Sequence, residues 1–246
     1  MNTSIQTFEL NDIAFDINFK SIKNVHLSVH PPLWRVTISA PIWMDFDTIR
    51  LFAIAKLGWI RKQQDKLKNQ KRETEREYID REGHHFLWKR YLLKVIEDPL
   101  FTGIKLKHSE IHIHLKDKNN REKKEEILHS WYRQQLRISI TPMLEKYSES
   151  MNITINDIKI RKMRTKWWSC NSKTWRILLN TELAKKSLEC IEYVLIHEMV
   201  HMLERNHNDT FKNHMTKYCP KWENIRVSLN RSELWYLDWN YKKKSR

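Results

Sequence analysis

The feature that most constrains this chain is an apolar segment, residues 191–203, that carries two histidines four positions apart. Residues four apart share one face of an α-helix, so His197 and His201 can direct their imidazoles at a single ion. The aliphatic and methionine residues around them predict a helix with a buried face, and such burial holds ligands in a fixed geometry. Ser187 precedes the segment and predicts the N-cap of this helix.

A third histidine follows at a spacing that suits the same ion. His207 comes six residues after His201, and Asn206 tolerates a left-handed backbone, so the helix can end there and the chain can turn. This is the ligand spacing of metzincin-type sites, with Glu204 in the place of their glycine. Two alternatives stay open: His214 from the next helix as the third ligand, and Glu204 as a carboxylate that orients a histidine.

The chemistry of such a cluster indicates zinc. Zn²⁺ prefers nitrogen ligands in tetrahedral geometry, and a catalytic site keeps one position for water. Glu198, which follows the first histidine, can reach that water and take its proton as the water attacks a carbonyl carbon. We therefore expect one Zn²⁺ per chain and hydrolysis of a peptide bond. A purely structural site has no need of a base at this position.

The composition excludes one class of function and leaves another open. Three glycines in 246 residues rule out the glycine-rich loops that bind nucleotide phosphates. The net charge of +15 is typical of chains that meet polyanions. The alternative function is therefore a basic protein associated with nucleic acid. Its metal site would be structural or latent, or would act only on DNA-bound proteins.

The cysteines and the apolar pattern bear on location. Cys170, Cys190 and Cys219 form no CxxC pair and fit no metal ribbon. The N-terminus lacks the apolar core of a secretory signal, and no apolar run reaches the length of a membrane span. We therefore expect a cytoplasmic protein with reduced thiols and no membrane contact. Cys170 has no histidine placed by local sequence to activate it, so it is interpreted as a core residue rather than a nucleophile.

The order of apolar patterns predicts an α+β fold in two portions. Residues 1–116 are expected to be β-rich around one long helix from Asp45 or Asp47 to about Glu77. Residues 117–246 are expected to be mostly helical, with a short antiparallel sheet, and both portions can pack as one unit. The charged tract 116–126 is the best linker candidate. A helix follows at 127–147, which Pro142 must bend or break. Strands are expected at 13–19, 25–29, 34–39, 86–87, 91–96, 104–106, 111–115, 153–160, 167–170 and 175–179.

Two C-terminal stretches carry a family resemblance. Residues 193–207, followed by Phe211, are similar to the signature of the YgjP-like metallopeptidases, bacterial zincins related to the SprT and WLM groups. Residues 162–170, followed by Ile177–Asn180 and Leu183, resemble a second segment of that family. A diffuse likeness extends into the N-terminal half, so the resemblance covers nearly the whole chain.

The resemblance implies a fold and a site. Its zinc ligands would be His197, His201 and His207, and Glu198 would be the general base. It also implies a β-rich N-terminal portion and a C-terminal zincin-like catalytic portion that acts on a peptide or protein. The strand at 167–170 would lie beside the active site, where its backbone could pair with an extended substrate peptide.

The chain departs from the family pattern at the expected cleft. Lys166-Trp167-Trp168 stands where the family usually has Arg-Trp-Gly, and Trp88 replaces a usual glycine. Glycine allows close approach of a backbone and tryptophan does not, so the substrate preference of the family is not carried over. Lys166, Trp167 and Ser169 are the candidate substrate-binding residues. Lys166 or Ser169 could donate to the carbonyl oxyanion.

Overall fold

The computed structural model describes residues 5–30, 35–69, 76–163, 167–171 and 176–231. Helices and small sheets alternate along them, which confirms the α+β class. The chain divides into two compact units near residue 72, whereas the sequence pattern placed the boundary near 116. The difference arises because apolar residues between 78 and 115 share one hydrophobic core with the helices that follow them.

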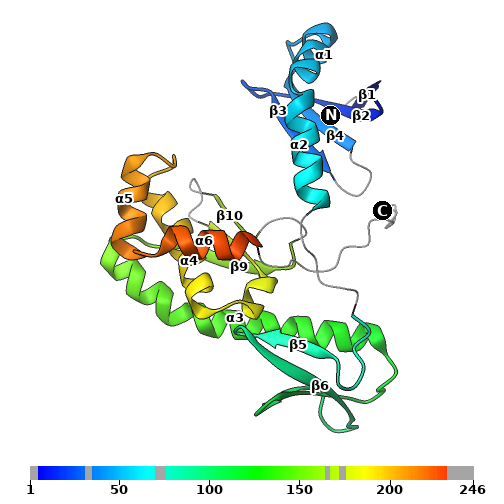
Figure 1. Ribbon diagram of the computed structural model, residues 1–246, viewed down its shortest axis with the longest axis vertical. Helices are drawn as coiled ribbons and strands as arrows, with labels where there is room; N and C mark the ends of the chain where they lie inside the picture. Colours follow the sequence, from blue (N-terminus) through cyan, green and yellow to red (C-terminus); the bar gives the residue numbers. More distant parts are fainter. Residues whose placement is uncertain (1–4, 31–34, 70–75, 164–166, 172–175, 232–246) are drawn as a thin grey trace. The chain divides into compact units, whose positions relative to one another are not determined.

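The first unit is a four-stranded sheet with two helices (Figure 1). The strand order is β1-β2-β4-β3, with β2 and β4 parallel and the other pairs antiparallel. Alternate residues of β2 and β4 are buried, as their period-two apolar pattern predicts. β1 lies in a polar stretch where no strand was expected, and residues 31–34, before β4, lie outside the described residues. The strands are β1 (Ile5–Leu10), β2 (Ile13–Lys20), β3 (His26–His30) and β4 (Arg35–Pro41).

The long helix expected after the first strands is two helices, α1 (Phe46–Ala55) and α2 (Leu57–Lys68). Asp45 caps α1 through its side chain, as the sequence predicted. The break falls at Lys56, whose backbone leaves the helical region and closes α1. Neither helix reaches Glu77, because residues 76 and 77 are not helical. Apolar residues of both helices cover the sheet and complete a small core of their own.

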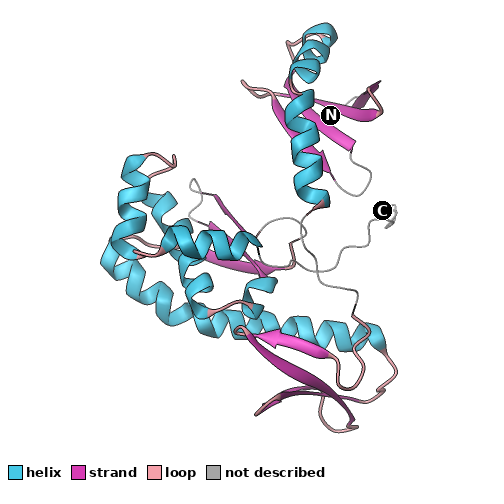
Figure 2. Cartoon of the chain, viewed as in Figure 1, coloured by secondary structure: helices cyan, strands magenta, loops and turns pink. Residues whose placement is uncertain are grey.

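The second unit holds the long helix α3, two further sheets and the C-terminal helices (Figure 2). One sheet has the strand order β5-β6-β8-β7 and the other has the order β10-β11-β9. The first sheet is built from β5 (Gly83–Phe86), β6 (Lys89–Glu97), β7 (Gly103–Lys107) and β8 (Glu110–Leu115). The second is built from β9 (Asp157–Arg161), β10 (Trp168–Asn171) and β11 (Arg176–Asn180).

Helix α3 (Arg121–Met151) begins earlier and runs further than its apolar pattern indicates. The second half of the tract proposed as a linker, from Arg121 on, is the start of this helix, which Asn120 caps: its side chain accepts a hydrogen bond from the Lys123 amide at 2.8 Å. Pro142 lies inside the helix and does not end it. Buried residues spaced along the whole length of α3 pack against the rest of the unit, and this packing outweighs the local cost of the proline.

The small sheet beside the C-terminal helices is mixed rather than antiparallel. β10 and β11 form the expected antiparallel pair, whereas β9 runs parallel to β11. Asn180, at the end of β11, is fully buried and holds the preceding loop in place. Its side-chain oxygen accepts from the Met163 amide at 3.2 Å, and its side-chain nitrogen donates to the Met163 carbonyl at 3.0 Å. Asn180 thus satisfies backbone groups at the end of a strand.

Three helices complete the second unit after the short 3-10 turn η1 (Thr181–Lys185). They are α4 (Leu188–Leu203), α5 (Asp209–Tyr218) and α6 (Trp222–Arg231). Ser187 caps α4 by accepting from the Cys190 amide at 3.3 Å. Among the helices in the described ranges, none combines the length and apolar character that crossing a membrane requires.

Candidate metal centre

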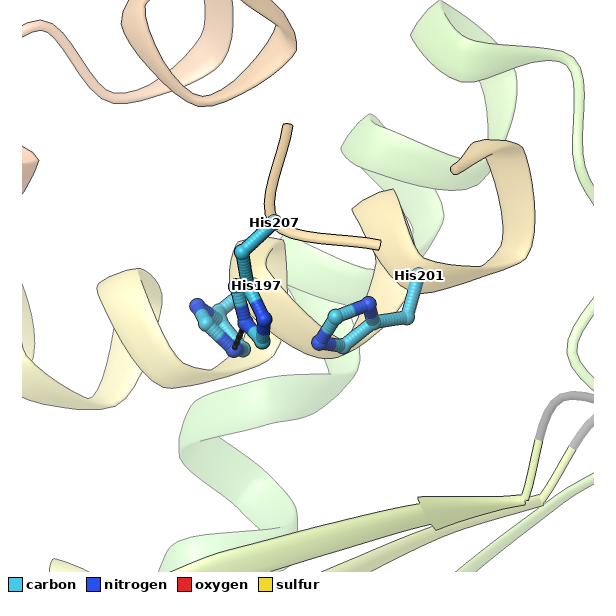
Figure 3. A group of neighbouring side chains, drawn as sticks. All are labelled: His197, His201 and His207. Atoms are coloured by element: carbon cyan, nitrogen blue, oxygen red, sulfur yellow. Dashed lines mark hydrogen bonds between the residues drawn. The ribbon is translucent and has the colours of Figure 1, made fainter. Parts of the chain in front are cut away.

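Three histidines from one helix and the loop after it meet at a single point. His197 and His201 lie on α4, and His207 lies in the loop between α4 and α5 (Figure 3). One ring nitrogen from each lies within 4.8 Å of the others, and this is the metal-type cluster found in the part of the chain that the structure describes. His214 is not in the cluster, and its ring stacks instead on Tyr218.

The spacing of two of these nitrogens matches that of ligands on one ion. The Nε2 atoms of His197 and His207 are 3.3 Å apart. Two imidazoles bound tetrahedrally to zinc at ordinary bond lengths place their nitrogens about 3.3 Å apart. The three nitrogen donors therefore suit a zinc-type ion, and the distance between the Nε2 atoms of His197 and His207 suits one as well.

The end of α4 sets the tautomer of His201. Its Nδ1 lies 3.2 Å from the backbone carbonyl oxygen of Glu204, so Nδ1 carries the proton and Nε2 keeps its lone pair for a metal. Glu204 therefore orients a histidine through its backbone, not through the carboxylate considered from the sequence. That carboxylate accepts from the Asn206 amide at 2.9 Å and shapes the loop that carries His207.

The turn after α4 forms differently from the sequence expectation. The helix ends because Glu204 takes an extended conformation, with φ −140° and ψ 118°. Asn206 is not among the described residues with positive φ, so no left-handed asparagine is needed there. The loop nevertheless brings His207 back over the ligands of the helix, as the sequence predicted (Figure 3).

Burial keeps the helix histidines neutral. Desolvation, followed by the nearby His201 and His207, lowers the pKa of His197 to about 3. Desolvation also lowers the pKa of His201, whereas the hydrogen bond that its ring donates to the Glu204 backbone carbonyl raises it. A neutral imidazole has the free lone pair that a metal ligand needs, so both rings are ready to bind an ion near neutral pH.

Aromatic rings enclose the cluster. Phe211, buried in α5, lies 5.1, 4.7 and 4.5 Å from the ring centroids of His197, His201 and His207. Trp168, on β10, contacts His197 from another side with a centroid distance of 5.4 Å. Phe211 belongs to the family signature, but sequence reasoning did not place it against all three imidazoles.

Glu198 is carried by the same helix as the histidines. It is 1% exposed, so its carboxyl group lies in the protein interior and not on the surface. Tyr193, one turn earlier on α4, is also buried and contacts the His197 ring at a centroid distance of 5.8 Å. Buried acids are rare unless they have a role, which favours a functional reading of Glu198.

The residues expected to bind substrate lie in different environments. Trp167 is 6% exposed, and its ring belongs to the hydrophobic core, with the Lys186 ammonium 5.1 Å from the ring centroid. Trp168 is the tryptophan whose ring meets the cluster. Ser169 lies on β10 by its backbone, which pairs with Leu178 of β11. Lys166 lies outside the described residues.

Among known proteins, a family of metallopeptidases matches this chain. The model of the YgjP-like metallopeptidase domain matches residues 23–232. A search of curated proteins finds no match. Among solved structures, the zymogen of the metallopeptidase jannalysin from Methanocaldococcus jannaschii is 24% identical, with a TM-score of 0.33, over 38% of this chain and 92% of that one. The zymogen of abylysin from Pyrococcus abyssi is 19% identical, with a TM-score of 0.35, over 39% and 99%.

The matched domain and the histidine cluster define the class of protein as a metallopeptidase. More particularly, the chain belongs to the YgjP-like metallopeptidase family, whose model covers most of its length. Membership implies a metal ion and a peptide or protein substrate.

Proposed function

We propose that this chain is a zinc-dependent peptidase whose single metal site is formed by His197, His201 and His207. The observation that carries the proposal is the convergence of three imidazole nitrogens within 4.8 Å, two of them at the separation of zinc ligands. Nitrogen ligands in this number suit zinc and leave one coordination position for water, as in catalytic zinc sites.

Zinc in this site would polarise a water molecule, lower its pKa and polarise the scissile carbonyl group. The chain supplies the proton transfers. Glu198 accepts the proton of the attacking water and delivers it to the nitrogen of the leaving amine, so the peptide C–N bond breaks and two termini form. The buried position of Glu198 keeps this carboxyl group away from bulk water.

The substrate is proposed to bind as an extended peptide along β10. This strand is at the edge of its sheet, so one row of its backbone groups is not paired with another strand of that sheet. An added peptide strand can use those groups, because main-chain hydrogen bonds at a sheet edge are a common mode of peptide recognition. The contact between Trp168 and His197 supports this position, since it places β10 directly beside the cluster.

The decisive experiment pairs metal analysis with cleavage. Purified wild-type protein should hold close to one zinc per chain and cleave peptides. Glu198→Gln should keep the zinc and lose activity by about 100- to 10,000-fold, because only the proton acceptor is removed. Zinc-free protein after purification without chelators, or full activity in Glu198→Gln, would refute the proposal.

A further inference from the structure

A second site lies at the start of the long helix, away from the histidine cluster. A cavity of about 690 Å³ opens there, and none of the three histidines lines it. Its volume is in the range of pockets that hold small organic ligands. Its lining combines basic, acidic and aliphatic side chains: Glu77, Ile79, Asp80, Val95, Lys118, Asn119, Arg121 and Lys124.

The most informative residue of this cavity is Lys124. It is 6% exposed and lines the cavity, yet no acidic side chain of the described residues forms an ion pair with its ammonium group. Lysine side chains are rarely this buried unless they are paired. The ammonium group of Lys124 is therefore available to pair with an anion that enters the cavity.

The neighbouring cation is held in place by the protein. The Arg121 guanidinium lies 5.8 Å from the centre of the Tyr78 ring and donates to the Arg76 carbonyl oxygen at 2.8 Å. These contacts already restrict the Arg121 side chain, so less conformational entropy is lost when an anion binds to it. Lys118 adds a third positive charge at the rim, where its only ion pair among the described residues is a 3.8 Å contact with Glu97.

The helix itself adds to the positive potential. α3 is 31 residues long, and its N-terminus faces the cavity through Asn119, Arg121 and Lys124. The amides of a first helical turn have no partners within the helix, and the helix dipole is positive at that end. Side chains on a helix tilt toward its N-terminus, so Lys124 is directed at the same end. Oxyanions such as phosphate bind at this kind of helix start.

The other residues that line the cavity are acidic or aliphatic. Asp80 accepts a hydrogen bond from the Val95 amide at 2.6 Å, and Glu77 is exposed beside it. Carboxylates disfavour a second anion but accept hydrogen bonds from hydroxyl or amino groups. Ile79 and Val95 add apolar surface to the lining. The cavity is much larger than a phosphate ion alone would need, which leaves room for an attached organic group.

We propose that this cavity binds a small phosphate monoester that also carries hydroxyl groups, such as a nucleoside monophosphate. The phosphate lies at the start of α3 between Lys124 and Arg121, and the hydroxyl groups face Asp80 and Glu77. The site is separate from peptide hydrolysis and does not depend on the proposed zinc chemistry. It gives the peptidase a means of responding to a phosphorylated metabolite.

The test is a binding titration of the full chain at constant ionic strength. The probes are inorganic phosphate, adenosine 5′-monophosphate and adenosine, followed by isothermal calorimetry. Saturable binding is expected for the monophosphate, weaker binding for phosphate and none for adenosine. Binding of adenosine as strong as that of its monophosphate, or the absence of saturable binding by either phosphate compound, would overturn the proposal.

Variants of two adjacent lysines make the test specific. Lys124→Met should weaken monophosphate binding by roughly tenfold or more, because a charge-assisted contact is lost. Lys123→Met is the matched control, since that lysine is exposed and pairs with Glu126 at 2.8 Å, and its affinity should equal that of wild type. Equal affinity in Lys124→Met and wild type would refute the site.

Stability provides an independent readout. Without ligand, Lys124→Met should melt at the same temperature as wild type or higher, because the lost ammonium group forms no ion pair with an acidic side chain of the described residues. Monophosphate should then raise the melting temperature of wild type and not that of the variant. Should Lys124→Met not fold, Arg121→Gln serves as the second variant, and undiminished monophosphate binding by it would equally contradict the proposal.

Discussion

The indole ring of Trp168 contacts the imidazole of His197 with a centroid distance of 5.4 Å and an interplanar angle of 60°. It also meets Tyr193 at 6.0 Å and 87°. The ring therefore forms one wall of the site next to the ligand nitrogen atoms. The resemblance noted in the sequence places a glycine of the family pattern at position 168, so we expect this wall to be particular to this chain.

We expect Trp168 to restrict the side chains accepted beside the scissile bond. Trp168→Ala opens this wall and should shift cleavage toward substrates with larger side chains there. Zinc affinity should fall by no more than about tenfold, because an aromatic contact contributes roughly 0.5–1.5 kcal/mol. Peptide-library cleavage, compared with zinc content, measures both. An unchanged cleavage profile would show that the ring does not line the substrate cleft.

The third ligand can be assigned by a pair of alanine variants. His207→Ala should weaken zinc binding by more than the roughly 10- to 100-fold that follows loss of a ligand's supporting partner, because a ligand itself is removed. His214→Ala should bind zinc as wild type does, since that ring stacks on Tyr218 and is not in the cluster. Competition with a chromophoric chelator measures both affinities. The reverse ranking would assign the third ligand to His214.

Phe211 is expected to position the ligands in addition to filling the core. Phe211→Ala should lower the free energy of unfolding by about 3–5 kcal/mol, as for a large buried ring. Phe211→Leu keeps most of the volume and should cost less than about 1.5 kcal/mol. It should still weaken zinc binding, because the ring surface against three imidazoles is lost. Urea unfolding of the zinc-free protein and zinc titration separate these effects, and wild-type zinc affinity in Phe211→Leu would exclude a positioning role.

The turn between β5 and β6 stores backbone strain. Leu87 and Trp88 have φ values of 46° and 68°, the left-handed region that favours glycine. Trp88 is 63% exposed, so little packing is lost when its side chain is removed. Trp88→Gly should raise the free energy of unfolding by ~1 kcal/mol, because a residue without Cβ adopts this conformation without strain.

Trp88→Ala is the matched control for that variant, because it removes the indole but keeps Cβ. It should gain none of this stability. Urea unfolding curves of the two variants and wild type measure the differences. Equal stability of the glycine and alanine variants would locate the effect in the side chain and not in the backbone.

Local pattern predicted much of the fold. The strands β2, β4, β6 and β8 alternate buried and exposed residues or follow apolar runs, and their positions were predicted to within a few residues. The helix α3 was predicted too short, because its first turns are charged and Pro142 suggests an end. Its extent depends on the Asn120 cap and on burial along its length, and burial is a property of the packed unit. The parallel pairing of β9 with β11 is equally non-local.

In the site, too, some features follow from local sequence and others depend on tertiary packing. The sequence alone determined His197, Glu198, His201 and their helix, because four-residue spacing on one helix places both imidazoles on one face. Its spacing also predicted His207, but left His214 as an alternative. Only the tertiary structure places His207, and not His214, beside His197 and His201, and only it brings Trp168 and Phe211 against the imidazoles. These residues come from separate elements, so their contacts depend on how the strand and helices pack, which no local spacing encodes.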